Sequence, residues 1–205
     1  MSAQFQPKPA QRYTYSDYLS WPEDERWELI DGVAYDMAPA PSTRHQSVVL
    51  KIAARLEQKL AGKPCRPYTA PTDVKFSETD MVQPDVLVVC DPAKITPSHI
   101  EGAPDLVVEV LSPATLFKDL REKFDLYQRG GVREYLAVNC AENYLHRFRL
   151  GEDGLFGPPE LFTGSDLLLL VSLEGLEIPL WEVFELPEPA EPGPLAPGKG
   201  PETWR

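Results

Sequence analysis

This 205-residue sequence has few cysteines and no long apolar run, and both absences narrow the class of protein. Its three cysteines, Cys65, Cys90 and Cys140, are odd in number and widely spaced, which argues against a disulfide framework and against a cysteine-ligated zinc site. We therefore expect them to be reduced. No run approaches the ~18 apolar residues of a membrane span, and the N-terminus lacks a basic-then-apolar signal pattern. These features predict a cytoplasmic protein.

Basic residues are also scarce, with 20 Lys and Arg against 32 Asp and Glu, so that the net charge is −12. Non-specific affinity for nucleic acid comes mainly from Lys and Arg that neutralise phosphates, so this balance counts against a simple nucleic-acid coat. An enzyme with a local basic rim is still compatible with it, because acidic tails and an acidic site both inflate the total.

The composition predicts one folded domain between two looser ends. The hydrophobic fraction of 42% and the charged fraction of 25% are typical of a globular protein. We expect a flexible arm over residues 1–12, a single domain over residues 13–186, and a disordered tail rich in proline and glycine over residues 187–205.

Two acidic residues lie in the central stretch of the chain, where the surrounding residues predict buried strands. The runs 86–90 and 106–108 are almost wholly apolar and β-branched, as in strands that are covered on both faces. Asp85 opens the first run and Glu109 lies inside the second, which continues as Val110 and Leu111. A buried carboxylate needs a cation, a hydrogen-bonding network or a shifted pKa. If the two strands are neighbours, both acids can converge on one Mg²⁺ or Mn²⁺, although Asp85 also fits a simple turn position after Pro84.

The remaining pattern predicts an α+β fold with an α/β-like core, in which a mixed central sheet is flanked by helices and preceded by an N-terminal β-hairpin. The expected helices and strands are a short helix over 14–21, a hairpin over 26–37 with Asp31-Gly32 at its turn, a helix over 42–60, a strand over 68–76, a proline-rich connection over 91–104, a helix over 112–130, strands over 133–139 and 144–150, and closing segments near 162, 167–171 and 176–184.

The predicted helix over 112–130 carries a lysine with two interpretations. Leu116, Leu120, Phe124 and Tyr127 are expected on its buried side, with Tyr127 as a core residue. Asp119 and Lys123 are four residues apart on one face. Lys123 either leans over the metal-binding end of the strands or remains in solvent, where it pairs with Asp119 for a few tenths of a kcal/mol.

Several short segments, taken in their order along the chain, resemble one protein family. These segments are Glu-Leu-Ile-Asp-Gly (28–32), Pro-Ser-Thr-Arg-His-Gln (41–46), Gln-Pro-Asp (83–85), Ala-Pro-Asp-Leu-Val-Val-Glu-Val-Leu-Ser-Pro (103–113), Asp119 through Lys123, Tyr127, and Gly-Val-Arg-Glu-Tyr (131–135). Together they resemble the Uma-two family of restriction endonuclease-like proteins, within the PD-(D/E)XK nuclease superfamily, over about residues 12–185. No single segment would be specific, whereas the ordered set is.

The resemblance implies a restriction-endonuclease-like fold and metal-dependent hydrolysis of DNA phosphodiester bonds. It makes Asp85 and Glu109 the metal ligands. The lysine that the family usually has two positions after the second acid is Leu111 here, and Lys123 is similar to a displaced version of that lysine. A homodimer is compatible with the resemblance, because double-strand cutting needs two sites.

Two further residues are auxiliary candidates, and a second class of function stays open. Glu28 either contacts the metal site or faces water, and His45 either contacts a phosphate or simply belongs to the start of its helix. The alternative function is a nuclease fold with weak or no catalysis that serves as a binding or interaction module, which Leu111 and the acidic surface favour.

Overall fold

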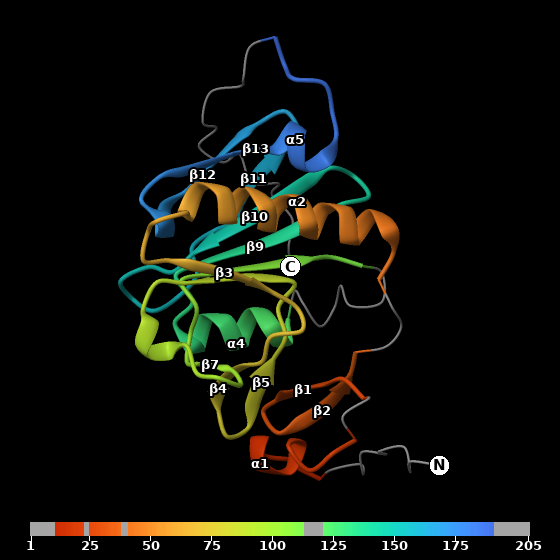
Figure 1. Cartoon of the computed structure of the whole chain (residues 1–205), viewed down its shortest axis with the longest axis vertical. Helices are drawn as coiled ribbons and strands as arrows, with labels where there is room; N and C mark the ends of the chain where they lie inside the picture. Colours follow the sequence, from red (N-terminus) through yellow and green to blue (C-terminus); the bar gives the residue numbers. More distant parts are fainter. Residues whose placement is uncertain (1–10, 23–24, 38–40, 113–120, 191–205) are drawn as a thin grey trace.

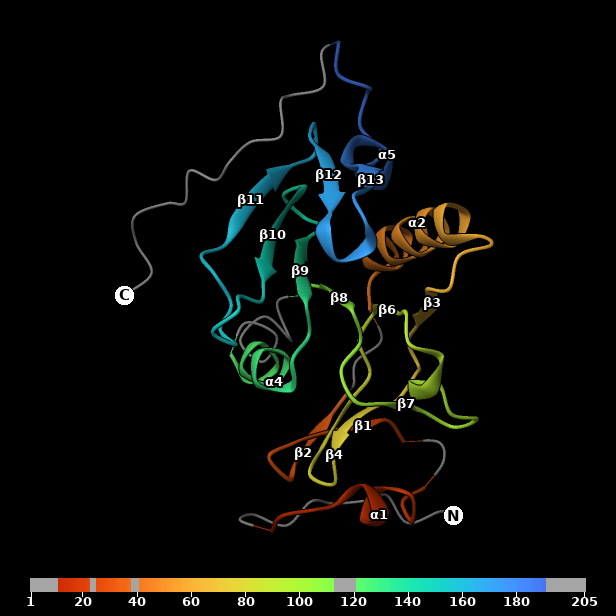
Figure 2. The ribbon, with the colours of Figure 1, turned by 90° about the vertical axis from the view of Figure 1, so that its left-hand side faces the viewer.

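The computed structural model describes residues 11–22, 25–37, 41–112 and 121–190. Within these ranges the chain forms the mixed α+β fold that the sequence predicts, with helices on both faces of a six-stranded sheet and a five-stranded sheet at one end (Figures 1 and 2). The predicted helix positions Leu116, Leu120 and Asp119 and most of the predicted tail lie outside the described residues.

The larger sheet supplies the two strands on which the metal-site prediction depends. Its strands are β3 (Arg66–Thr69), β6 (Val86–Val89), β8 (Leu106–Val110), β9 (Glu134–Asn139), β10 (Tyr144–Arg149) and β11 (Glu160–Thr163), in the spatial order β11-β10-β9-β8-β6-β3. The β8 and β9 strands are parallel, and every other neighbouring pair is antiparallel. Because β6 and β8 pair directly, the strands that carry Asp85 and Glu109 are neighbours, as expected.

Alternation along the buried strands divides the core into two layers. Val86 and Val88 belong to the layer under helix α2 (Thr43–Leu60), whereas Leu87 and Val89 belong to the layer that includes helix α4 (Glu122–Gly130). The two helices lie on opposite faces of the sheet (Figures 1 and 2). Burying such side chains contributes about 1.5–3 kcal/mol each, so both faces are held firmly.

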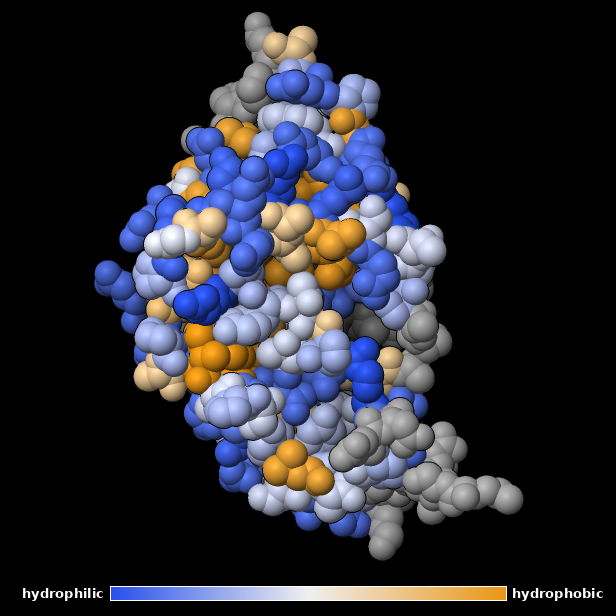
Figure 3. Space-filling view, in the orientation of Figure 1, coloured by the Kyte–Doolittle hydropathy of each residue, from blue (hydrophilic) through white to orange (hydrophobic). Residues whose placement is uncertain are grey.

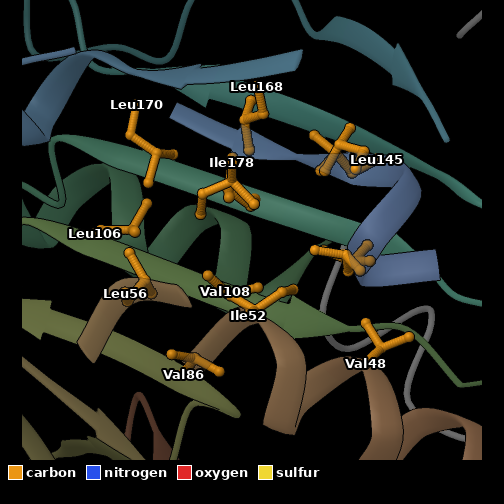
Figure 4. Close-up of a cluster of buried hydrophobic side chains, with 14 of the residues drawn as sticks. Val48, Ile52, Leu56, Val86, Leu106, Val108, Leu145, Leu168, Leu170 and Ile178 are labelled. Carbon is orange, nitrogen blue, oxygen red and sulfur yellow. The ribbon is translucent and has the colours of Figure 1, made fainter. Parts of the chain in front are cut away.

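Helix α2 is stabilised by a capped N-terminus and by an apolar face that packs on the sheet, and a glycine follows its C-terminus. Ser42 caps its N-terminus by accepting a hydrogen bond from the His45 backbone N–H at 3.2 Å, as the sequence predicts. Val48, Ile52 and Leu56 point from this helix toward the sheet (Figure 4). Gly62, just beyond the helix, has a φ of 78°, a conformation that glycine adopts without strain.

The smaller sheet contains the predicted hairpin. Its strands are β1 (Trp27–Ile30), β2 (Val33–Asp36), β4 (Val74–Ser77), β5 (Asp80–Val82) and β7 (Ile100–Glu101), in the order β2-β1-β5-β4-β7. Asp31 and Gly32 form the hairpin turn with φ values of 50° and 72°, which confirms the prediction. Helix α1 (Tyr15–Tyr18) begins at the predicted cap, Thr14, and is shorter than expected.

The prediction of one strand over residues 68–76 was wrong. The structure has two strands there, β3 in the larger sheet and β4 in the smaller one. Residues 70–73 form no strand, and Pro71 within them has no backbone N–H to donate to a ladder. The proline-rich connection contains two short elements that the sequence did not predict, the strand β7 and the single helical turn η1 (Pro92–Lys94).

The expectation that all cysteines are reduced was wrong as well. Cys65 and Cys90 form a disulfide with an S–S distance of 2.04 Å, and Cys140 is free and buried. The register of β3 and β6 pairs Arg66 with Val89, so the residues just beyond that pair, Cys65 and Cys90, face each other on neighbouring strands. This proximity comes from strand pairing between segments 25 residues apart, which the spacing of the cysteines alone did not reveal.

The C-terminal part of the described chain closes the α2 side of the larger sheet. It consists of β12 (Leu167–Leu170), η2 (Val171–Leu173), β13 (Leu176–Pro179) and α5 (Leu180–Phe184). Leu168, Leu170 and Ile178 from this part join the layer under α2 (Figure 4). Of the segments predicted near 162, 167–171 and 176–184, the first lies in β11 of the larger sheet, and the other two form a hairpin followed by a short helix.

The surface in the orientation of Figure 1 is largely hydrophilic, with separate hydrophobic patches (Figure 3). The exposed large hydrophobic residues come from different elements and loops, and they are Leu19, Val33, Leu50, Leu155, Val171 and Leu186. Among the described residues, no helix is both long enough and apolar enough to cross a membrane.

Candidate active site

The candidate site lies where the two sheets meet. The chain leaves the smaller sheet at the end of β5, passes through Gln83, Pro84 and Asp85, and enters the larger sheet as β6. Glu28 comes from β1 of the smaller sheet, and Glu109 comes from β8 of the larger one. The lysine of the site, Lys123, comes from helix α4. The three acidic residues and this lysine therefore come from four separate parts of the chain.

Lys123 is the centre of the site and is not a solvated surface lysine. It is 3% exposed, and its Nζ lies 2.8 Å from Glu28 Oε1 and 2.8 Å from Glu109 Oε1. Glu28 is fully buried and Glu109 is 3% exposed. The ammonium group thus bridges two buried carboxylates that the chain brings together from different sheets.

Tyr127 adds a hydrogen bond to the same carboxylate. Its hydroxyl donates to Glu109 Oε1 at 2.5 Å, and its side chain is fully buried. Burial, together with the negative charges of Glu109 and Glu28, raises the pKa of Tyr127 well above its usual range, so the hydroxyl keeps its proton and remains a donor. Lys123 and Tyr127 are four residues apart on α4, and both reach Glu109 because such pairs share one helix face.

Asp85 lies at the start of the strand next to that of Glu109. The register of β6 and β8 pairs Val86 with Val108, so Asp85, just before Val86, and Glu109, just after Val108, lie at the same end of this strand pair. Asp85 Oδ2 accepts the Val110 backbone N–H at 2.8 Å and lies 3.2 Å from His45 Nε2. The Asp85 side chain is 22% exposed, so this side of the site is its more open one.

A polar network behind the site fixes the segment that carries Asp85. The Gln83 backbone N–H donates to Glu28 Oε1 at 3.0 Å. The Gln83 side chain accepts from Arg26 at 2.7 Å and donates to Asp73 at 2.8 Å, and Gln83 is 5% exposed. Burial raises the pKa of Asp73, although its contacts with Gln83 and nearby positive groups oppose that effect. Glu28 and Asp85 are thereby anchored through one short segment.

The donor chemistry of the site suits a hard divalent cation. Glu28, Asp85 and Glu109 bring three carboxylates, and Lys123 and His45 are the basic groups in contact with them. Within the described ranges, no group of three or more His, Cys, Asp or Glu residues is arranged to hold a metal ion. Mg²⁺ does not need such a cage, because it is commonly held by one or two carboxylates together with waters and substrate phosphate. Asp85 and Glu109 provide carboxylates of that chemistry.

The site residues predicted from the sequence fall into two sets of contacts at neighbouring strands. Lys123 contacts Glu28 and Glu109, whereas His45 contacts Asp85, which precedes the strand next to that of Glu109. Tyr127 is buried as expected, but its contact with Glu109 was missed. Its four-residue spacing from Lys123 was the signal that could have revealed it.

Comparison with known proteins identifies the family and the fold. The model of the Uma2 family, which carries the description "Putative restriction endonuclease", matches residues 15–181. The chain is 29% identical over 150 residues to the uncharacterised protein slr1290 of Synechocystis sp., a match that covers 71% of this chain and 78% of that protein. It also superposes with a TM-score of 0.69 on the crystal structure of "a putative nuclease belonging to DUF820" from Anabaena variabilis, at 17% identity, over 84% of this chain and 97% of the other. The restriction-endonuclease-like fold expected from the sequence is thus the observed one.

Proposed function

The chain belongs to the Uma2 family, and on that basis we propose that it is a nuclease that hydrolyses DNA phosphodiester bonds with a divalent metal ion, Mg²⁺ or Mn²⁺. The observation that carries the proposal is the position of Lys123, whose Nζ lies 2.8 Å from Oε1 of Glu109 on β8, the neighbour of the strand that Asp85 precedes. Carboxylates that would hold a metal ion, with a lysine beside one of them to balance charge, can support metal-assisted phosphodiester hydrolysis.

Each residue has a distinct role in the proposed reaction. Asp85 and Glu109 are the metal ligands, and a bound Mg²⁺ supplies an acidified water and charge stabilisation for the phosphate oxygens. Lys123 orients the attacking water or balances the growing negative charge. The water oxygen forms a bond to phosphorus as the bond from phosphorus to one sugar oxygen breaks. The attacking water gives up one proton to solvent or a nearby carboxylate, and the departing sugar oxygen takes up one proton from solvent.

Glu28 and His45 support these groups. Glu28 provides the second carboxylate contact of Lys123, at the same 2.8 Å as Glu109, so it helps to fix the position of the ammonium group. His45 contacts Asp85 at 3.2 Å, so it holds that carboxylate in place or contributes positive charge near the phosphate.

The direct test is a cleavage assay on plasmid DNA with Mg²⁺ or Mn²⁺. The wild type should cut, an excess of chelator should stop it, and Asp85→Ala and Glu109→Ala should each lose at least about 10²-fold in rate, since a metal ion supplies several kcal/mol of charge stabilisation and 1.36 kcal/mol is tenfold. Glu152→Ala is a matched control, because this exposed carboxylate lies in the loop between β10 and β11. Equal background cleavage by the wild type and both site variants would remove the proposal.

The substrate is defined by parallel assays with linear duplex DNA, single-stranded DNA and RNA at the same metal concentration. The proposal expects duplex DNA to be cut fastest. Preferential cutting of RNA would retain the phosphodiesterase chemistry and overturn the assignment to DNA.

A second candidate function is a nuclease fold that binds a partner without useful catalysis. Two observations favour it: Leu111 stands where the family usually has lysine, and Lys123 is held by two carboxylates. Titration with Ca²⁺ or Mn²⁺ separates the candidates. Uptake that disappears in Asp85→Ala supports the enzyme, whereas the absence of uptake together with background cleavage supports the binding module.

A further inference from the structure

We infer that Lys123 is the internal counter-ion of the site and competes with the divalent metal ion for Glu109. This inference rests on the proposed function, since it concerns the metal site named there. It adds a second role for the same lysine, which is to neutralise the buried carboxylates whenever the metal is absent.

The contacts of Lys123 are those of a bound cation. Its Nζ lies at 2.8 Å from an oxygen of Glu28 and at 2.8 Å from an oxygen of Glu109. The side chains of all three residues are at most 4% exposed, so water screens these charges poorly. In this position the ammonium group offsets the negative charge of the two carboxylates, as a bound metal ion would.

Charge explains why the fold needs such a cation. Glu28 and Glu109 together carry two negative charges in a nearly dry environment, and removing the positive partner of such a group is strongly destabilising. Tyr127 donates a hydrogen bond to Glu109 but brings no charge. Lys123 is the charged group that these contacts place between the two acids.

Competition follows from the shared oxygen atom. Glu109 Oε1 accepts both Lys123 and Tyr127, so a metal ion that used this atom would meet an oxygen that already has two donors. A metal ion at this atom would therefore be repelled by the positive charge of Lys123, and it would have to share an oxygen that Lys123 and Tyr127 already contact. Removing the positive charge of Lys123 should strengthen metal binding even though it removes a residue of the proposed catalytic machinery.

Two measurements on Lys123→Met test this. In a chelator, its melting temperature should fall by roughly 10 °C, because a buried carboxylate pair loses its cation. In Mn²⁺ most of that loss should be recovered, and the wild type should gain less. By calorimetry, the variant should bind Mn²⁺ at least about 10-fold more tightly than the wild type, which corresponds to about 1.4 kcal/mol.

If Lys123→Met does not fold, a double variant whose buried group has the same net charge as in the wild type replaces it in the test. Glu28→Gln with Lys123→Met has the same net charge in the buried group as the wild type, and its reference is Glu28→Gln alone. The inference expects the double variant to bind Mn²⁺ more tightly than that reference. Equal or weaker binding would overturn the inference.

The outcomes also separate this inference from the proposed function. If the wild type binds Mn²⁺, Asp85→Ala loses that binding and Lys123→Met gains none, then the metal site stands and the competition is wrong. If none of these proteins takes up Mn²⁺ and the wild type does not cleave DNA, both the inference and the metal-dependent function are wrong.

Discussion

Two clusters of buried charge among the described residues can be compared, one around Arg147 on the outer strands of the larger sheet and one around Lys123 where the sheets meet. In the first, Arg147 of β10 pairs with Glu134 of β9 and Glu160 of β11, and Arg149 also bonds Glu160 at 2.7 Å. Ser172 donates to Glu134 through its backbone N–H at 2.9 Å and its hydroxyl at 2.7 Å. Two acids thus meet two arginines and further neutral donors.

The Lys123 cluster is balanced differently. Three carboxylates, those of Glu28, Asp85 and Glu109, are in contact with one lysine and one histidine. Both clusters contain buried charges, so burial alone does not set them apart. In the ion pairs named above, carboxylates outnumber basic groups around Lys123 but not around Arg147, and such a balance would favour a divalent cation at the Lys123 cluster.

The largest effect on this comparison should come from Arg147→Met. The substitution keeps much of the side-chain volume but leaves Glu134, which is 1% exposed, without its cation. We expect a loss of about 3–5 kcal/mol in the free energy of unfolding, because breaking a buried ion pair strands a charge. Urea unfolding measures it, and nuclease activity below the denaturation range should be retained.

The matched control is Arg149→Met. Arg149 is half exposed, so its bond to Glu160 should be worth less than about 1 kcal/mol. Equal losses in the two variants would show that the Arg147 cluster is not the structural anchor that its burial indicates.

Glu109→Gln should separate the clusters by function. Replacing this carboxylate by an amide should lower the cleavage rate by at least about 10²-fold, whereas Glu160→Gln should leave the rate unchanged because it lies outside the site. Initial rates on plasmid DNA at saturating Mg²⁺ provide the measurement. A comparable fall in both variants would mean that the activity reports folding and not chemistry.

Tyr127→Phe tests the neutral donor in the site. It removes the hydroxyl that donates to Glu109 and keeps the buried ring, so we expect a loss of about 1–3 kcal/mol in the free energy of unfolding. Chemical denaturation detects it. Equal stability of Tyr127→Phe and the wild type would contradict this expectation.

The smallest effect should be a dependence on pH from the Arg147 cluster. Burial works to raise the pKa of Glu160, but the hydrogen bonds and charges of Arg147 and Arg149 outweigh it and lower the pKa below its ordinary value of 4.5. A lowered pKa in the folded state contributes stability above pH 4.5 that is lost as the pH falls through the lowered value. The difference in urea midpoint between the wild type and Glu160→Gln should therefore shrink below that pH. A difference that is constant with pH would contradict it.

Much of the fold could be predicted because local chemistry determines it. The cap at Ser42, the turn at Asp31-Gly32 and the apolar alternation of β6 and β8 each act over a few residues, and each appears in the structure as expected. The two apolar runs predicted the strands next to Asp85 and around Glu109. The resemblance to a family supported the prediction that these strands are neighbours.

The rest depended on contacts between distant segments. The spacing of Cys65 and Cys90 says nothing of the strand pairing that joins them, and the division of residues 68–76 between two sheets follows from where each half packs. The choice for Lys123 between solvent and the site likewise depended on Glu28, which arrives from another sheet. No local pattern carries that information.

Leu111 stands two residues after Glu109, where a motif with a fixed spacing between acid and lysine would require lysine. Leu111 packs in the layer on the α4 side of the sheet, so the end of β8 provides a hydrophobic contact and α4 brings the ammonium group instead. The lysine in contact with Glu109 therefore comes 14 residues after it in the sequence and not two. A search for a fixed acid-to-lysine spacing would overlook this chain, whereas a search for any ammonium group within reach of the strand acid would retrieve it.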